Sequence, residues 1–134
     1  MKRFLGLITA IGLAACTQME MPTASDGALL YANNCAICHG KTGKGDGTIA
    51  NDLDRKPSDL TRIAARRGGQ FPVAEVLSTI DGYTRLEPQR QDMPEFGHLL
   101  EGELVPLDTG DGVMTPTPRP LVALVAYLEN IQEG

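Results

Sequence analysis

Three residues in one short stretch have the types and the spacing needed to hold a haem covalently. Cys35 and Cys38 are separated by two residues and His39 follows directly, which gives the pattern C-x-x-C-H. A c-type haem is attached at this pattern. Each thiol can form a thioether bond with one vinyl group of a haem, and the neighbouring neutral imidazole is a good axial ligand for the iron. The motif therefore predicts one covalent haem c with His39 as an axial ligand.

Two other kinds of site share parts of this motif. A thioredoxin-like redox pair also uses C-x-x-C, but it needs a βαβ context, and no alternating β-rich run flanks the motif. A zinc site needs two further ligands at metal-binding spacing. The remaining cysteine, Cys16, and the other histidine, His98, stand singly and far away. Haem attachment fits the flanking sequence best.

The first residues of the chain are typical of an export signal. Residues 1–3 are Met-Lys-Arg, and residues 4–14 form an apolar stretch too short to span a bilayer. Residues 13–16 are Leu-Ala-Ala-Cys, which resembles a bacterial lipobox with Cys16 as the lipidated residue. An ordinary signal peptide with Cys16 as an incidental thiol is the alternative. Either interpretation predicts export to the periplasm.

The domain organisation follows from that signal. We expect a lipoprotein-type signal peptide over residues 1–15, a lipidated cysteine with a short tether over 16–24, and one domain over 25–134. The chain has three cysteines, so two serve the haem, one serves the lipid, and no disulfide is needed. The lipid would anchor the domain to a membrane without a spanning helix.

Charge is distributed unevenly along the chain. The formal net charge is −5, which argues against nucleic acid as a partner. Residues 41–67 nevertheless carry seven basic and four acidic side chains, whereas residues 81–134 carry three basic and ten acidic ones. The basic excess follows the haem motif and would steer an acidic redox partner towards the haem edge. A solvated surface of mixed charge explains the pattern equally well.

Helical patterns dominate the rest of the chain. A first helix is expected over 27–34, capped by Ser25 or Asp26, and a short one through residues 64 and 65, capped by Asp59 or Ser58. A third is expected from Pro72 to Gly82, and a last one after residues 118–120, with an apolar stripe formed by Leu121, Leu124, Val125 and Leu128. No convincing strand is visible. The glycine-dense segment 40–47 is interpreted as a loop that follows a flat ligand closely.

With these elements in place, residues 25–132 resemble a class I (mitochondrial-type) monohaem cytochrome c. The resemblance rests on Gly27 and Tyr31 before the haem motif, on Tyr127 in the last helix, and on Met93-Pro94 after it. It implies an all-α cytochrome c fold of four or five short helices and long loops around one haem. It also implies that Met93 is the sixth ligand of the iron, and that the carbonyl of Pro57 accepts the N–H of the His39 ring.

The sixth ligand has alternatives within the same region. The segment 101–117 is longer and more polar than is usual for this family. It contains Met114, and His98 lies just before it. Met114 would cover the haem edge or fill the core, and His98 would give a bis-histidine haem of lower potential. An iron without a sixth ligand is the remaining alternative.

The resemblance implies a one-electron carrier and not an enzyme. We expect brief contacts with donor and acceptor proteins of a respiratory chain or a dehydrogenase, or permanent membership of a larger complex of that kind. The alternative function is a haem protein with an open or labile sixth site that binds a diatomic gas or reacts with peroxide. A peroxide site would need a distal acid–base residue, for which His98 is the available histidine.

Overall fold

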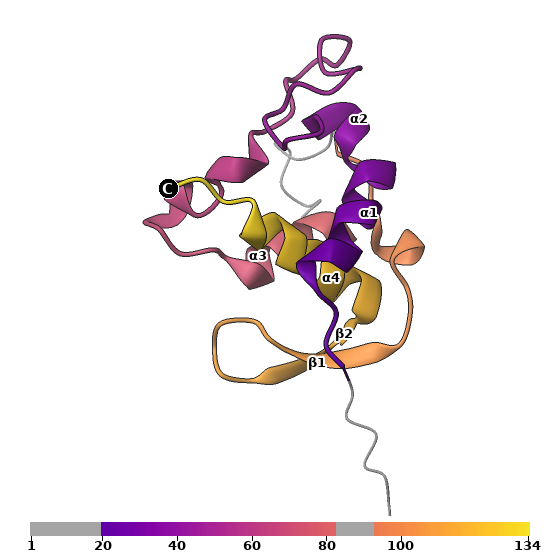
Figure 1. Ribbon diagram of the computed structural model, residues 1–134, viewed down its shortest axis with the longest axis vertical. Helices are drawn as coiled ribbons and strands as arrows, with labels where there is room; N and C mark the ends of the chain where they lie inside the picture. The colour runs from indigo at the N-terminus through magenta and orange to yellow at the C-terminus, as the bar shows by residue number, and fades with distance from the viewer. Residues whose placement is uncertain (1–19, 83–92) are drawn as a thin grey trace, which may run out of the picture.

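The structure is a computed structural model that describes residues 20–82 and 93–134. The signal peptide expected over 1–15 and the lipidation site Cys16 lie outside these residues. The described elements, in chain order, are α1 (Ala24–Asn34), α2 (Ala36–His39), 3₁₀ turns at Leu60–Arg62 and Ala65–Arg67, α3 (Val73–Asp81), a 3₁₀ turn at Gly97–Leu99, strands β1 (Leu104–Asp108) and β2 (Met114–Pro118), and α4 (Arg119–Asn130) (Figure 1). No described helix has the length and apolar character needed to cross a membrane.

The first helix begins earlier than its sequence suggests. Its N-cap is Thr23, whose hydroxyl accepts from the backbone N–H of Asp26, while the Asp26 carboxylate accepts from the N–H of Thr23 at 2.8 Å. This reciprocal pair is a capping box. The prediction that Ser25 or Asp26 is the cap was therefore wrong: Asp26 occupies the third helical position, where its carboxylate completes the box.

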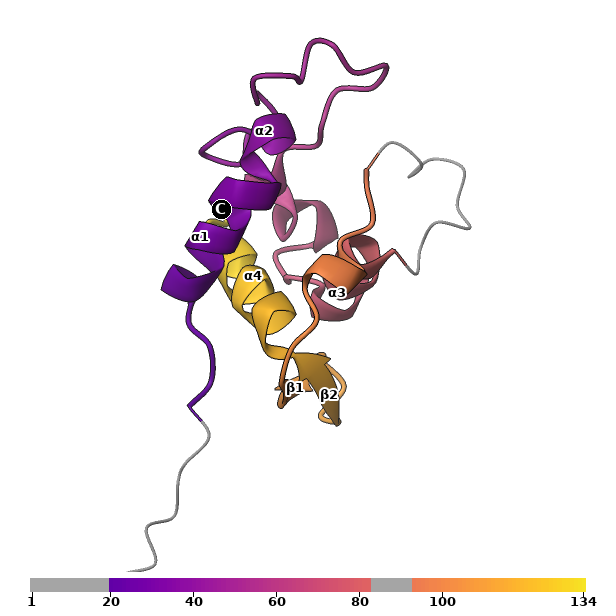
Figure 2. The same ribbon diagram turned by 90° about the vertical axis from the view of Figure 1, so that its right-hand side faces the viewer.

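The molecule is built around the packing of α1 against α4 (Figure 1, Figure 2). Gly27 and Tyr31 share the buried face of α1, and the ring centroids of Tyr31 and Tyr127 are 4.9 Å apart. The Tyr31 hydroxyl donates to the carbonyl of Gly40 at 2.7 Å. The predicted stripe of α4 is buried as expected. It joins a core that also takes in α3 and Leu100, comprising Tyr31, Val76, Ile80, Leu100, Leu121, Leu124, Val125 and Leu128.

The segment expected to form one short helix near residue 60 forms two 3₁₀ turns instead. Asp59 caps the first turn, as predicted, by accepting from the N–H of Thr61 at 2.9 Å. Regular helix does not continue, because the N–H of Ala64 donates to the side chain of Gln132 at 2.8 Å. Gly68 then ends the second turn with a left-handed backbone, φ +69°. The third helix, α3, ends at Gly82 as expected, with Pro72 as its N-cap and not its first residue.

A β-hairpin occupies the region where no strand was expected, so that expectation was wrong. Strands β1 and β2 pair antiparallel, with Val105 opposite Thr117 and Pro106 opposite Pro116. Val105 and Thr117 are buried against the domain, whereas the opposite face carries exposed Leu104 and Met114. Since the exposed face is mostly apolar while Thr115 and Thr117 share the face of Val105, the sequence lacks the alternation that identifies a half-buried strand.

The prolines of the hairpin lie where a missing N–H does no harm. The N–H of Arg119 donates to the carbonyl of Glu103 at 2.8 Å, which makes 103/119 a hydrogen-bonded pair. Such pairs alternate along an antiparallel ladder, so the pairs 105/117 and 107/115 also direct their N–H groups at the partner strand. Pro106, Pro116 and Pro118 fall at the alternate positions, whose nitrogens point away from the partner strand. Three prolines therefore remain compatible with a two-stranded ladder.

Candidate functional site

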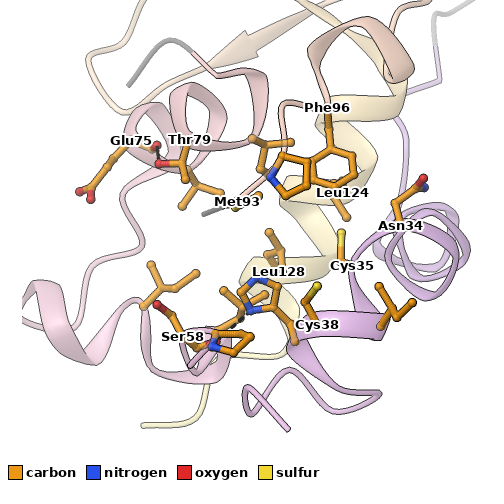
Figure 3. A pocket seen from close by; sticks show the side chains of 18 of the residues that line it. Asn34, Cys35, Cys38, Ser58, Glu75, Thr79, Met93, Phe96, Leu124 and Leu128 are labelled. Carbon is orange, nitrogen blue, oxygen red and sulfur yellow. Dashed lines mark hydrogen bonds between the residues drawn. The ribbon is translucent and has the colours of Figure 1, made fainter. Parts of the chain in front are cut away.

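An apolar cavity of about 620 Å³ lies between α2, the loop before residue 60, α3, the segment after residue 92 and α4 (Figure 3). Its walls include Val76, Ile80, Phe96, Leu124 and Leu128. Cys35, Cys38, His39 and Met93 also line it, so the structure brings together the four residues predicted to hold the haem. Figure 3 shows the side chains of Cys35, Cys38 and Met93 directed towards the same space.

The two cysteines are held at the junction of two helices. Cys35 ends α1, donating its N–H to the carbonyl of Tyr31 at 2.9 Å, and it is also the N-cap of α2. One turn of helix then separates its side chain from Cys38. Burial, followed by the nearby Cys38, raises the pKa of Cys35 to about 11, so that this thiol is protonated at neutral pH.

The imidazole of His39 has a defined hydrogen-bond partner. Its Nδ1 lies 2.9 Å from the carbonyl oxygen of Ser58. A carbonyl can only accept, so Nδ1 carries the proton and Nε2 keeps a free lone pair for a metal. Burial lowers the pKa of His39, and the Ser58 carbonyl offsets part of that shift. The effect of burial is the larger, and the net lowering favours the neutral imidazole that a metal binds.

The partner of His39 differs from the prediction by one residue. The resemblance implied the carbonyl of Pro57, but the acceptor is that of Ser58. Pro57 lines the cavity, and its own carbonyl faces the glycine loop, where a Cβ on Gly45 would collide with it. A main-chain acceptor leaves no side-chain signal in the sequence, which is why the exact residue was missed.

The other two sixth-ligand alternatives lie away from the cavity. Met114 is on the outer face of the hairpin with 64 % of its surface exposed, and His98 is an exposed residue of a 3₁₀ turn. Neither lines the cavity. Met93 does, on a segment that the Phe96 N–H ties to the carbonyl of Ile80 at 3.0 Å. The segment 83–92, which precedes Met93, lies outside the described residues.

The glycine-dense loop serves backbone packing, which corrects the expectation that it follows a flat ligand. A Cβ on Gly45 would meet the Pro57 carbonyl, and one on Gly47 would meet the carbonyl of Ile37. The N–H of Gly45 also donates to the carbonyl of His39 at 2.8 Å. These close approaches press the loop against both the haem motif and the segment that carries Ser58.

Four of the basic residues in segment 41–67 are among the residues that line the cavity. Arg55, Lys56, Arg66 and Arg67 are all exposed and all among its lining residues. Arg67 also donates its Nε to the carboxylate of Glu75 at 2.9 Å. We name Arg55, Lys56, Arg66 and Arg67 the basic rim. Glu75 and Asn34, which also line the cavity, were not singled out from the sequence.

The residues present fit a covalently attached haem. The cavity is large, mostly apolar and lined by two thiols, a correctly protonated imidazole and a thioether sulfur, which are the groups that such a cofactor uses. A family model described as "Cytochrome C oxidase, cbb3-type, subunit III" matches residues 22–105. No curated protein matches the chain. The matched region contains the haem motif and Met93, and it ends just inside β1.

Proposed function

Because the chain belongs to the cytochrome c family represented by that model, a family that performs haem-based electron transfer, we propose that it is a one-electron carrier with His39 and Met93 as the axial ligands of one haem c. The observation that carries this proposal is that Cys35, Cys38, His39 and Met93 line one apolar cavity. A bound haem would supply an iron that alternates between Fe(II) and Fe(III).

The protein's own residues would tune that cofactor in three ways. The thiols of Cys35 and Cys38 fix it covalently to one helical turn. The Ser58 carbonyl holds the proton of His39 on Nδ1, which orients the ring and raises the basicity of Nε2. The apolar walls exclude water and disfavour the additional charge of Fe(III), as does the soft sulfur of Met93. A site with both axial positions filled has no room for a substrate, which supports a carrier and not an enzyme.

The basic rim supports the proposal that an acidic surface of the redox partner meets the cavity mouth. Arg55, Lys56 and Arg66 provide positive potential there, although the chain as a whole is acidic. The name of the matched family supports service to a membrane-bound respiratory oxidase, as a brief partner or as a subunit. We expect the encounter rate with an acidic partner to fall as ionic strength rises.

Export and membrane attachment belong to the proposal and rest on the sequence of residues 1–16. The chain enters the domain at Glu20, whose carbonyl accepts from Nη1 of Arg119 at 2.7 Å, at the base of the hairpin. The hairpin lies at the opposite end of the molecule from α2 (Figure 1, Figure 2). A lipid on Cys16 would therefore hold the domain by the end remote from the haem motif.

The visible spectrum of the purified protein tests the proposed function directly. We expect a low-spin c-type spectrum, a weak far-red band from an iron–thioether bond in the oxidised state, and no change when carbon monoxide is added to the reduced protein. A clear shift with carbon monoxide would contradict a stable Met93 ligand. It would favour gas binding or peroxide chemistry, although His98, the expected acid–base residue for peroxide, does not line the cavity.

A further inference from the structure

The side chain of Gln132, just beyond α4, joins the C-terminal end of the chain to the segment that carries Ser58. Its Oε1 accepts from the N–H of Ala64 at 2.8 Å. Its Nε2 donates to the carbonyl of Leu60 at 2.8 Å and to that of Leu128 at 2.6 Å. One amide group thus binds both ends of the five-residue turn 60–64 and fixes that turn to the last helix.

Neighbouring contacts make this junction continuous with the His39 site. The N–H of Glu133 donates to the carbonyl of Thr61 at 2.8 Å, beside the bonds of Gln132. The N–H of Leu60 donates to the carbonyl of Gly43 at 2.6 Å, which links the same turn to the glycine loop. Ser58 precedes Leu60 by two residues, and its carbonyl oxygen lies 2.9 Å from His39 Nδ1. Leu60 and Ile63 of the turn also line the cavity.

We propose that Gln132 is a positioning residue for the axial histidine. It acts through the turn 60–64, which it holds at a fixed distance from α4 so that the Ser58 carbonyl stays within hydrogen-bond reach of His39 Nδ1. This inference rests on the proposed function, because the junction can position an axial ligand only if His39 binds the haem iron.

The amide of Gln132 supplies hydrogen bonds to backbone groups of the turn 60–64. Gln132 is half-buried and uses three of the four hydrogen bonds that its amide can make. The turn has 3₁₀ geometry, whose internal hydrogen bonds are poorer than those of an α-helix. The side chain of Gln132 therefore provides hydrogen-bond partners that the turn lacks within itself. Without it, the N–H of Ala64 and the carbonyl of Leu60 would have to find water, and the turn would open more readily.

The test compares Gln132→Ala with the wild-type holoprotein in the reduced, diamagnetic state. We expect the His39 Nδ1 proton to exchange with solvent about tenfold faster in the variant, because opening of the turn exposes it. We also expect the midpoint potential to rise, because a weaker hydrogen bond from Nδ1 makes the imidazole a poorer donor and stabilises Fe(III) less. Gln132→Glu keeps an acceptor for Ala64 but turns a second oxygen towards the carbonyls of Leu60 and Leu128, so it should also speed the exchange.

Glu133→Ala is the matched control. It removes the ion pair with Lys44, 2.9 Å in length, but leaves the main-chain bond from Glu133 to Thr61 in place. It should change neither the exchange rate nor the potential. Unchanged exchange and potential in Gln132→Ala, or equal changes in Glu133→Ala, would overturn the inference. A wild-type protein without a low-spin haem spectrum would instead overturn the proposed function, so the two failures are distinguishable. If Gln132→Ala does not fold, Gln132→Glu carries the exchange comparison.

Discussion

Gly27 in α1 lies directly against the carbonyl of Ala123 in α4, with no space for a side chain between them. An added Cβ would collide with that carbonyl and with Cβ of Tyr127. Both obstacles belong to packed helices, so neither can move without separating α1 from α4. The contact between α1 and α4 therefore depends on a residue that lacks a side chain.

Gly27→Ala should destabilise the holoprotein. In an exposed helix this change stabilises by about 1 kcal/mol, but overpacking a tight core contact costs about 1–3 kcal/mol, and here the second effect should dominate. Thermal unfolding followed through the haem absorbance measures the difference. Leu29→Ala, at a position of α1 that is 71 % exposed, should have little effect. An equal loss in both variants would contradict the contact.

Met93→Ala should open the iron. The reduced variant should bind carbon monoxide, and its midpoint potential should fall by an amount on the order of 0.1 V, within the roughly 0.8 V range that axial ligands set. Met114→Ala and His98→Ala should leave the spectrum and the potential unchanged, because neither side chain lines the cavity. If Met114→Ala alone produced the open site, the ligand assignment would be wrong.

Tyr31→Phe should weaken the connection between α1 and the glycine-dense segment 40–47. The variant leaves the buried carbonyl of Gly40 without its donor, which typically costs about 1–3 kcal/mol. Tyr127→Phe retains the ring contact with Tyr31 and removes a hydroxyl that does not bond to Gly40. Denaturant titration of both holoproteins should show the larger loss in Tyr31→Phe. The reverse order would mean that the ring contact, and not the hydroxyl, carries the stability.

Asp59→Ala should remove the cap of the turn at Leu60–Arg62 and cost about 1 kcal/mol at neutral pH. The hydrogen bond from the Thr61 hydroxyl is the main cause that holds the pKa of Asp59 below its ordinary value of 3.8. A lowered folded-state pKa stabilises the fold above the unfolded pKa, and that contribution disappears as pH falls through the folded value. The stability gap between wild type and variant should therefore persist at pH 5 and shrink below pH 3.8. A gap that is constant across this range would exclude the carboxylate as its cause.

Cys16→Ser should release the protein from membranes if Cys16 carries the lipid anchor. Fractionation of cells into membrane and soluble periplasmic extracts, followed by haem staining, measures the distribution. The spectrum should not change, because Cys16 precedes residues 22–105, which the family model matches. A variant that stays in the membrane fraction would place the attachment elsewhere, for example in a permanent complex with a membrane protein.

Much of the fold could be predicted from residues that are close together in the sequence. The apolar stripe of α4, the glycine that ends α3 and the haem motif at the end of α1 each have a signal within a few residues, and the structure confirms them. The residues that line the cavity were predictable where the side chain itself does the chemistry, as for His39, or where the resemblance supplied it, as for Met93.

The features that were missed depend on partners distant in sequence. Ser58 acts through its main chain, so its side chain carries no information about the bond to His39. The turn at 60–64 is set by Gln132, about seventy residues later. The hairpin has a mostly apolar exposed face, two threonines on the other face and several prolines, so a rule based on alternation does not detect its strands. In each case the decisive interaction is tertiary.

The prolines of the hairpin also affect how readily the polypeptide aggregates before its haem is attached. An exposed strand edge recruits strands from other molecules through its free N–H groups, and a chain with an unfilled cavity is especially vulnerable to such aggregation. Of the three outward positions of β2, two are Pro116 and Pro118, and Pro106 occupies the middle outward position of β1. The hairpin can therefore form its own two-stranded ladder while offering few donors to a third strand, which would help the polypeptide to avoid aggregation until the haem is attached.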